Sequence, residues 1–110
     1  MESEERKAAN EAVFREVNET MIGLQDTFAQ PTLGLLSLLC ECDRLGCADP
    51  IRVPSDVYET TREDGASFLI ARGHEDPTIE DIIDVGDGYL IVRKHAGSPR
   101  DVALDTDPRA

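Results

Sequence analysis

The chain has 110 residues, of which 31% are charged and 40% hydrophobic, but only 5% are aromatic. A chain of this length forms one domain, and domains this small often add a metal or disulfides to a modest core. The net charge of −12, with no basic patch to relieve it, argues against binding to nucleic acid. The longest apolar-rich run, residues 33–40, is too short to span a bilayer, so we expect no membrane partner either.

Three cysteines at short spacing are the most distinctive feature of the composition. The opening residues MESEE are acidic and lack the apolar stretch of a signal peptide. We therefore expect a cytoplasmic protein. In that reducing compartment, clustered cysteines bind metals or carry out chemistry rather than form disulfides.

Residues 4–29 are predicted to form one long helix, which the Gln30-Pro31 pair ends. Large apolar residues recur along it at intervals of three and four, the spacing of a single helical face. This apolar stripe consists of Phe14, Val17, Met21, Leu24 and Phe28. The stripe could pack on the protein's own sheet, pair with a second copy of the chain or bind a foreign protein.

The rest of the chain predicts short strands and one short helix. Strands are expected over residues 33–39, 51–53, 67–71, 79–85 and 89–94, and a helix from Pro54 to about Glu63. The Gly86-Asp87-Gly88 segment is typical of a tight hairpin turn between the last two strands. The last residues, 97–110, are predicted to be a mostly flexible tail anchored only at Val102 and Leu104.

Cys40, Cys42 and Cys47 place three thiols around a turn, and this is the pattern that carries chemistry. Zinc prefers about four such ligands in a tetrahedron, and the fourth often comes from a distant segment. The chain offers two histidines for that position, His74 at a strand end and His95. From the spacing alone, a zinc site, buried apolar cysteines and reactive thiols all remain open.

Several short motifs occur together in this chain. They are NEAVFREVNE at 10–19, CEC at 40–42 followed by Cys47, GHEDP at 73–77 and DGY at 87–89. This combination resembles a group of small uncharacterised actinobacterial proteins that open with NEALFREVNE and continue with CEC…C and GHEDP. The likeness covers most of residues 8–110. It implies that the three cysteines and the histidine of GHEDP occur together as zinc ligands, which favours His74 over His95.

Four protein ligands, Cys40, Cys42, Cys47 and His74, would leave no open position on the metal, so we predict structural rather than catalytic zinc. Two alternatives remain open. A thiol-based redox sensor or oxidoreductase would use the cysteine cluster. A metal-dependent hydrolase, which has less support, would need Glu75 as a base and one ligand replaced. The acidic residues between 75 and 87 lack the spacing of a calcium loop, so we expect a solvated face there.

The sequence therefore predicts an α+β fold: a long N-terminal helix and a small, mostly antiparallel sheet with one short helix, stapled by zinc. Residues 1–30 would be the amphipathic helix, 31–96 the zinc-binding domain and 97–110 the tail. We predict a non-enzymatic interaction or regulatory module that acts through its apolar stripe or its acidic face. Its partner would be a second copy of the chain or another protein.

Overall fold

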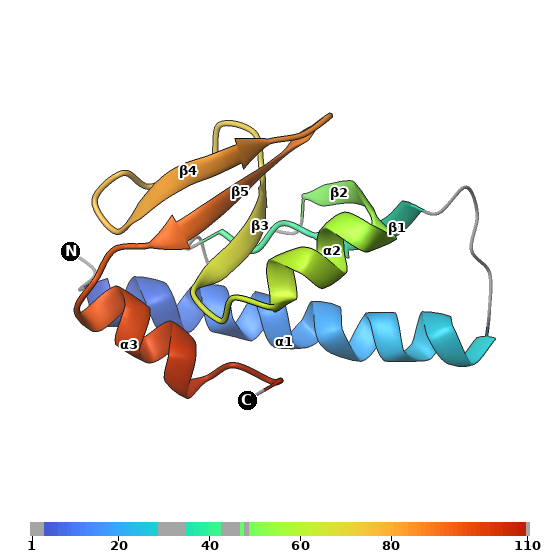
Figure 1. The fold of residues 1–110 in the computed structure, drawn as a ribbon, viewed down its shortest axis with the longest axis horizontal. Helices are drawn as coiled ribbons and strands as arrows, with labels where there is room; N and C mark the ends of the chain where they lie inside the picture. Colours follow the sequence, from blue (N-terminus) through green and yellow to red (C-terminus); the bar gives the residue numbers. More distant parts are fainter. Residues whose placement is uncertain (1–3, 29–34, 43–46, 48, 110) are drawn as a thin grey trace.

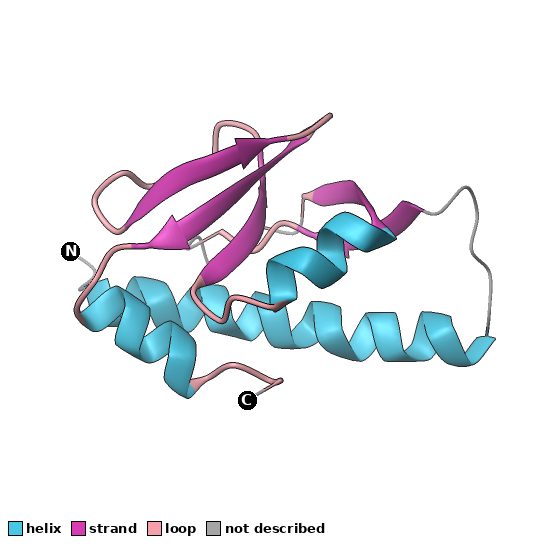
Figure 2. Ribbon diagram, in the orientation of Figure 1, coloured by secondary structure: helices cyan, strands magenta, loops and turns pink. Residues whose placement is uncertain are grey.

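In the computed structural model, the described residues are 4–28, 35–42, 47 and 49–109, with residues 4, 5 and 23–28 described by their backbone alone. The elements follow the order α1 (Glu4–Phe28), β1 (Leu35–Leu39), β2 (Pro50–Pro54), α2 (Ser55–Arg62), β3 (Ser67–Ala71), β4 (Glu80–Val85), β5 (Tyr89–Lys94) and α3 (Ser98–Asp105). Figures 1 and 2 show the long helix α1 running beneath the strands. The predicted α+β class is confirmed.

The strands form two antiparallel sheets rather than the single one expected. β1 pairs with β2, so that Leu38 lies opposite Ile51. The second sheet has the order β3-β5-β4, and its β4–β5 hairpin turns through Gly88, whose φ of +84° favours glycine. Pro50 and Pro54 bound β2 and lack N–H donors, which limits the first sheet to a short ladder.

Two apolar clusters fill the space between the sheets and the helices. The first joins α1, β1, β2, α2 and the second sheet through residues such as Ile22, Leu38, Tyr58 and Leu69. The second gathers Phe68, Ile70, Leu90, Val92 and Ala103 with the buried residues Cys40 and Cys42. No helix in the described parts of the chain is long and apolar enough to cross a membrane.

The C-terminal segment, predicted to be a mostly flexible tail, contains the helix α3. Pro99 lies in its first turn, where a missing N–H costs nothing, and Ala103 is fully buried. Pro99 and Ala103 are the buried residues of α3, whereas of the two expected anchors Val102 is partly buried and Leu104 is 47% exposed. Helix α3 packs beside the N-terminal half of α1 (Figure 1).

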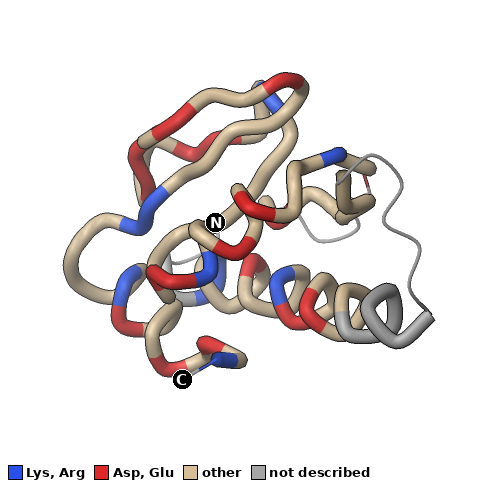
Figure 3. The backbone as a smooth tube through the Cα atoms, turned by 45° about the vertical axis from the view of Figure 1, so that its right-hand side comes forward, with Lys and Arg blue, Asp and Glu red and all other residues tan. Residues whose placement is uncertain are grey.

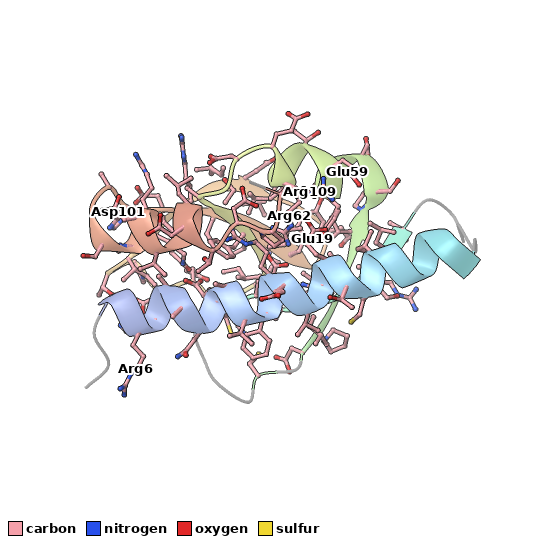
Figure 4. The ribbon with its side chains drawn as sticks, turned by 90° about the horizontal axis from the view of Figure 1, so that it is seen from below. Arg6, Glu19, Glu59, Arg62, Asp101 and Arg109 are labelled. Carbon is pink, nitrogen blue, oxygen red and sulfur yellow. The ribbon has the colours of Figure 1, made fainter. Side chains whose placement is uncertain are left out.

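Beyond α3, Arg109 ties the end of the chain to two helices. Its guanidinium donates to Glu19 of α1 at 2.5 Å and to Glu59 of α2 at 2.6 Å, and Figure 4 shows the three side chains together. Tyr58 donates its hydroxyl hydrogen to the same Glu19 carboxylate at 2.7 Å. The C-terminal residues thus contact the rest of the molecule through charged groups. Single charged residues form no repeating pattern in the sequence, so these contacts could not be predicted from it.

The buried face of α1 does not coincide with its apolar stripe. The buried residues are Ala8, Asn10, Glu11, Ala12, Arg15, Asn18 and Ile22, which are mostly small or polar. Of the stripe, Val17 is 38% exposed, Phe14 and Met21 are partly buried, and the side chains of Leu24 and Phe28 lie outside the described set. None of the described stripe residues is fully buried, and what covers the stripe stays open among the alternatives given above.

Charged residues on the buried face of α1 meet partners from distant segments. The Lys94 ammonium on β5 contacts the carboxylates of Glu11 and Glu80, and all three side chains are buried. Arg15 donates to the carbonyl oxygens of Gly65 at 2.6 Å and Ala103 at 2.7 Å. A buried charge strongly lowers the stability of the folded protein unless it has such partners. Because these partners lie at fixed positions on other elements, the contacts determine how α1 lies on the sheets.

Candidate metal centre

The predicted ligands Cys40, Cys42, Cys47 and His74 come together at one place in the fold. One ligand atom from each residue can be chosen so that all four atoms lie within 4.8 Å of one another. The three cysteines belong to the connection between β1 and β2, and His74 belongs to the connection between β3 and β4. A metal ion held there would join the two sheets.

Backbone hydrogen bonds hold the cysteine segment in place. The Cys40 N–H donates to the Asp49 carbonyl at 2.8 Å, which brings together the two ends of the connection. The next N–H, that of Glu41, donates to the Leu69 carbonyl of β3, also at 2.8 Å. The Ala71 N–H, at the end of β3, donates to the Cys40 sulfur at 3.1 Å. The end of β3 therefore positions the first cysteine directly.

A tight turn after β3 positions His74. Gly73 has a φ of +87°, and the His74 N–H donates to the Ala71 carbonyl at 3.2 Å. Nδ1 of the imidazole then lies 3.4 Å from the Cys40 sulfur and 3.7 Å from the Cys47 sulfur. Nδ1 is thus the ring nitrogen that faces the thiols.

Asp49 is a site residue that sequence reasoning missed. Its carboxylate lies 3.3 Å from Nε2 of His74, on the side of the ring away from the thiols. A carboxylate in this position fixes which ring nitrogen is free to bind a metal and strengthens it as a ligand. The nearest signal in the sequence was its place two residues after Cys47, which does not distinguish it from any other loop acid.

Glu41, between two of the cysteines, is the second residue whose role was missed. Its buried carboxylate accepts hydrogen bonds from the Leu69 N–H at 2.9 Å and from the Asn18 amide at 2.6 Å. It also forms an ion pair with Arg62 of α2, and both of these side chains are buried. The segment carrying the first two cysteines is thereby attached to α1, α2 and β3 at once.

The surroundings of Cys40 and Cys47 disfavour the thiolate forms of these two residues. Two effects raise the pKa of Cys40 well above its usual range. The larger is a hydrogen bond with the Cys42 side chain, and the second is burial of the thiol. Burial likewise raises the pKa of Cys47, although the backbone N–H of Asp49 opposes the shift. Reactive cysteines have a lowered pKa. The arrangement therefore suits thiols that become thiolates only when a cation binds them.

The second histidine lies elsewhere. Nε2 of His95 is 3.1 Å from the Asp81 carboxylate at the surface, and His95 is not part of the group of convergent ligand atoms. The Cys3His group can hold a metal ion, and its four protein donors match the coordination number of structural metal sites.

Comparisons with known proteins found no match among protein-family models, curated proteins or solved structures. The resemblance to the actinobacterial group therefore stays a prediction.

Proposed function

We propose that this protein is a non-enzymatic module whose small fold is stabilised by one structural zinc ion and which acts by binding another protein. The observation that carries the proposal is the convergence of Cys40, Cys42, Cys47 and His74 within 4.8 Å, from two connections far apart in the sequence. None of the three cysteines forms a disulfide in the described parts of the chain, which fits a reducing compartment, so we place the protein in the cytoplasm.

The distances support zinc as the metal. In a tetrahedral site with Zn–S near 2.3 Å and Zn–N near 2.0 Å, sulfur and nitrogen ligands lie about 3.5 Å apart. The Cys40 and Cys47 sulfurs lie 3.4 and 3.7 Å from Nδ1 of His74. The contact between Asp49 and Nε2 of the same ring is the carboxylate–histidine arrangement that commonly accompanies zinc.

A structural role has more support than a catalytic one. Four protein ligands fill a tetrahedral zinc ion, whereas catalytic sites keep one position for water or substrate. The redox alternative also has less support, because Cys40 and Cys42 are fully buried and the pKa of Cys40 is raised rather than lowered. The metal would instead add stability that a core of this size lacks, by joining the two sheets.

The apolar stripe of α1 supports an interaction role. Val17 is 38% exposed and its neighbour Val13 is 54% exposed, while Phe14 and Met21 are only partly buried. Contiguous exposed apolar groups on a soluble protein commonly mark a binding face. A helix in this setting presents anchors at intervals of three and four residues to a groove or to a second helix.

Metal analysis and thermal unfolding together test the zinc centre. We expect one zinc ion per purified chain. Cys40→Ser should remove it and lower the melting temperature by about 10 °C or more, the shift that roughly 2 kcal/mol produces in a domain of this size. Asp49→Asn should keep the zinc but weaken its binding by about 10-fold to 100-fold.

The two histidines provide a matched pair of variants for the same measurement. His74→Ala should release zinc, whereas His95→Ala should retain it, because His95 pairs with Asp81 at the surface. Zinc loss in the His95 variant alone would overturn the ligand assignment. A metal-free protein that melts at the temperature of the zinc-loaded form would overturn the structural role, and rapid zinc release by dilute peroxide would favour the redox alternative.

A further inference from the structure

Strand β4 lies at the edge of the three-stranded sheet, with β5 on its inner side and no other strand of the described chain on its outer side. Alternate residues of an edge strand direct their N–H and C=O groups away from the sheet. Such an edge is a template for a further strand unless the protein blocks it.

Part of this edge is already used. A bulge interrupts β4 between Ile82 and Asp84. The Glu80 N–H donates to the Asp76 carbonyl at 3.1 Å, and the Val85 N–H donates to the Asp84 carboxylate at 2.9 Å. A partner strand would therefore pair with the middle of β4, around Ile82 and Ile83.

Apolar side chains accompany these backbone groups on both faces of β4. Ile82 is 46% exposed, and Ile83 and Val85 are each 54% exposed, which is unusual for three residues in one short strand. On the α2 side, Ile83 and Asp84 line a groove together with Val57 and Ile91. An added strand would cover Ile83 with one set of its side chains, and these could extend into the groove.

Acidic residues flank the apolar ones along the same edge. Asp81, Asp84 and Asp87 are exposed, and Figure 3 shows acidic positions recurring along the β4–β5 hairpin at the top of the molecule. Asp64 adds a further carboxylate to the lining of the groove. A chain with a net charge of −12 attracts basic partners and repels acidic ones.

The charges argue against a second copy of this chain as the occupant. An antiparallel pair of β4 strands centred between Ile82 and Ile83 would place Asp81 of each copy opposite Asp84 of the other. A pair centred on Ile82 would place Asp84 opposite Glu80 of the other copy, whereas a pair centred on Ile83 would place no like charges opposite one another. Like charges directly opposite one another destabilise strand pairing, so two of these three registers are disfavoured. In the third, the net charge of −12 on each copy still opposes association.

We propose that β4 is a docking edge for an extended, basic segment of another protein, which adds to the second sheet as a fourth strand. The backbone of that segment pairs with the outer side of β4, and its lysines or arginines lie near Asp81 and Asp84. Its apolar residues cover Ile83 and the groove beside α2. This mode of binding combines main-chain hydrogen bonds for affinity with side-chain contacts for selectivity. It does not depend on the identity of the metal or on the stripe of α1.

The test uses a synthetic peptide of about eight residues, the length of a long strand, in which lysine and valine alternate. NMR titration of the zinc-loaded, isotope-labelled protein follows the backbone amides. We expect the shifts to concentrate at residues 81–85 and the affinity to fall as salt is raised. A peptide with glutamate in place of lysine should not bind. A lysine–valine peptide N-methylated at alternate residues should also fail, because it lacks N–H donors along one edge.

Matched charge reversals locate the binding edge on the protein. Asp84→Lys should lower the affinity for the lysine–valine peptide by about tenfold or more, and Asp81→Lys should act in the same direction. Glu16→Lys, the same charge change at an exposed position of α1, should alter the affinity by less than about twofold. Each variant is first checked for an unchanged zinc content and melting temperature.

Three results would overturn the proposal. The first is no binding of the lysine–valine peptide, or shifts centred on α1 rather than β4. The second is equal binding of the N-methylated peptide, which would reduce the contact to charge attraction alone. The third is a doubled molecular mass of the free protein that Ile83→Lys returns to that of a single chain, which would make a second copy the occupant.

Discussion

The two faces of α1 do not divide into an apolar inner face and a polar outer face, as they would in a simple amphipathic helix. The face that packs on the protein carries Glu11, Arg15 and Asn18, each fully buried, while Val13 on another face is 54% exposed. Burial of these three residues follows the position of their partners rather than hydrophobicity, because Glu11, Arg15 and Asn18 each contact a group on a distant segment. The comparison teaches that apolar periodicity locates a helix more securely than it locates the helix's inner face.

The largest expected effect comes from breaking the buried ion cluster. Lys94→Met removes the ammonium that contacts Glu11 of α1 and Glu80 of β4, and leaves two carboxylates buried without a cation. We expect the free energy of unfolding to fall by about 3–5 kcal/mol. Denaturant unfolding at neutral pH measures the loss.

The adjacent residue of β5 provides the control for this prediction. Arg93 is half exposed and pairs with Asp64 at the surface at 3.0 Å, so Arg93→Met should change stability by at most about 1 kcal/mol. Equal losses in the two variants would mean that the buried cluster contributes nothing beyond an ordinary surface pair.

Arg15→Met is expected to have the next largest effect. The variant keeps much of the side-chain volume but leaves the carbonyl oxygens of Gly65 and Ala103 without their donor. It also removes a guanidinium that lies 4.4 Å from the centre of the Phe68 ring. We expect a loss of about 2–3 kcal/mol in the free energy of unfolding. Glu16→Met, at an exposed position of the same helix, should change it by less than about 0.5 kcal/mol.

Much of the fold could be predicted from the sequence because its signals are local. The limits of α1 came from its helical period and the proline that follows it, and the β4–β5 hairpin came from Gly86-Asp87-Gly88. The grouping of the metal ligands was also predicted, because three cysteines close in sequence cannot lie far apart in space. The resemblance, rather than the spacing, favoured His74 over His95.

The parts that could not be predicted depend on contacts between distant residues. Lys94 lies 83 positions after Glu11, and nothing in either segment indicates the other. The same holds for Asp49, which acts through His74, and for α3, whose burial rests on the small residue Ala103. The two-sheet arrangement also escaped prediction, because strand patterns do not specify which strands pair.

Asn18→Ala should have a smaller effect that also reaches the metal centre. The Asn18 amide accepts the Leu39 N–H and donates to the Leu39 carbonyl, both at 2.9 Å, and it donates to Glu41 at 2.6 Å. Its removal should cost about 1–2 kcal/mol, because it loosens the end of β1 directly before Cys40. Zinc transfer to a chelator should be faster than in the unaltered protein. An unchanged transfer rate would show that the buried face of α1 does not support the ligand segment.

The smallest expected effect on stability comes from a substitution in the apolar stripe. The same variant tests which kind of partner the stripe binds. Val17 is 38% exposed, so Val17→Glu should change the free energy of unfolding of the single chain by less than about 0.5 kcal/mol. Ile22→Glu is the matched variant, because Ile22 is only 5% exposed. The new carboxylate would be buried among Leu38, Tyr58 and Leu69, and the free energy of unfolding should fall by several kcal/mol. Equal destabilisation by the two variants would mean that the stripe packs against the protein's own core after all.

Light scattering on Val17→Glu then identifies the partner class, because loss of a dimer mass points to a second copy. If the molecular mass and the melting temperature are both unchanged, the remaining partner is a different protein. The side chains of that protein would have to match the spacing of three and four residues between Phe14, Val17 and Met21.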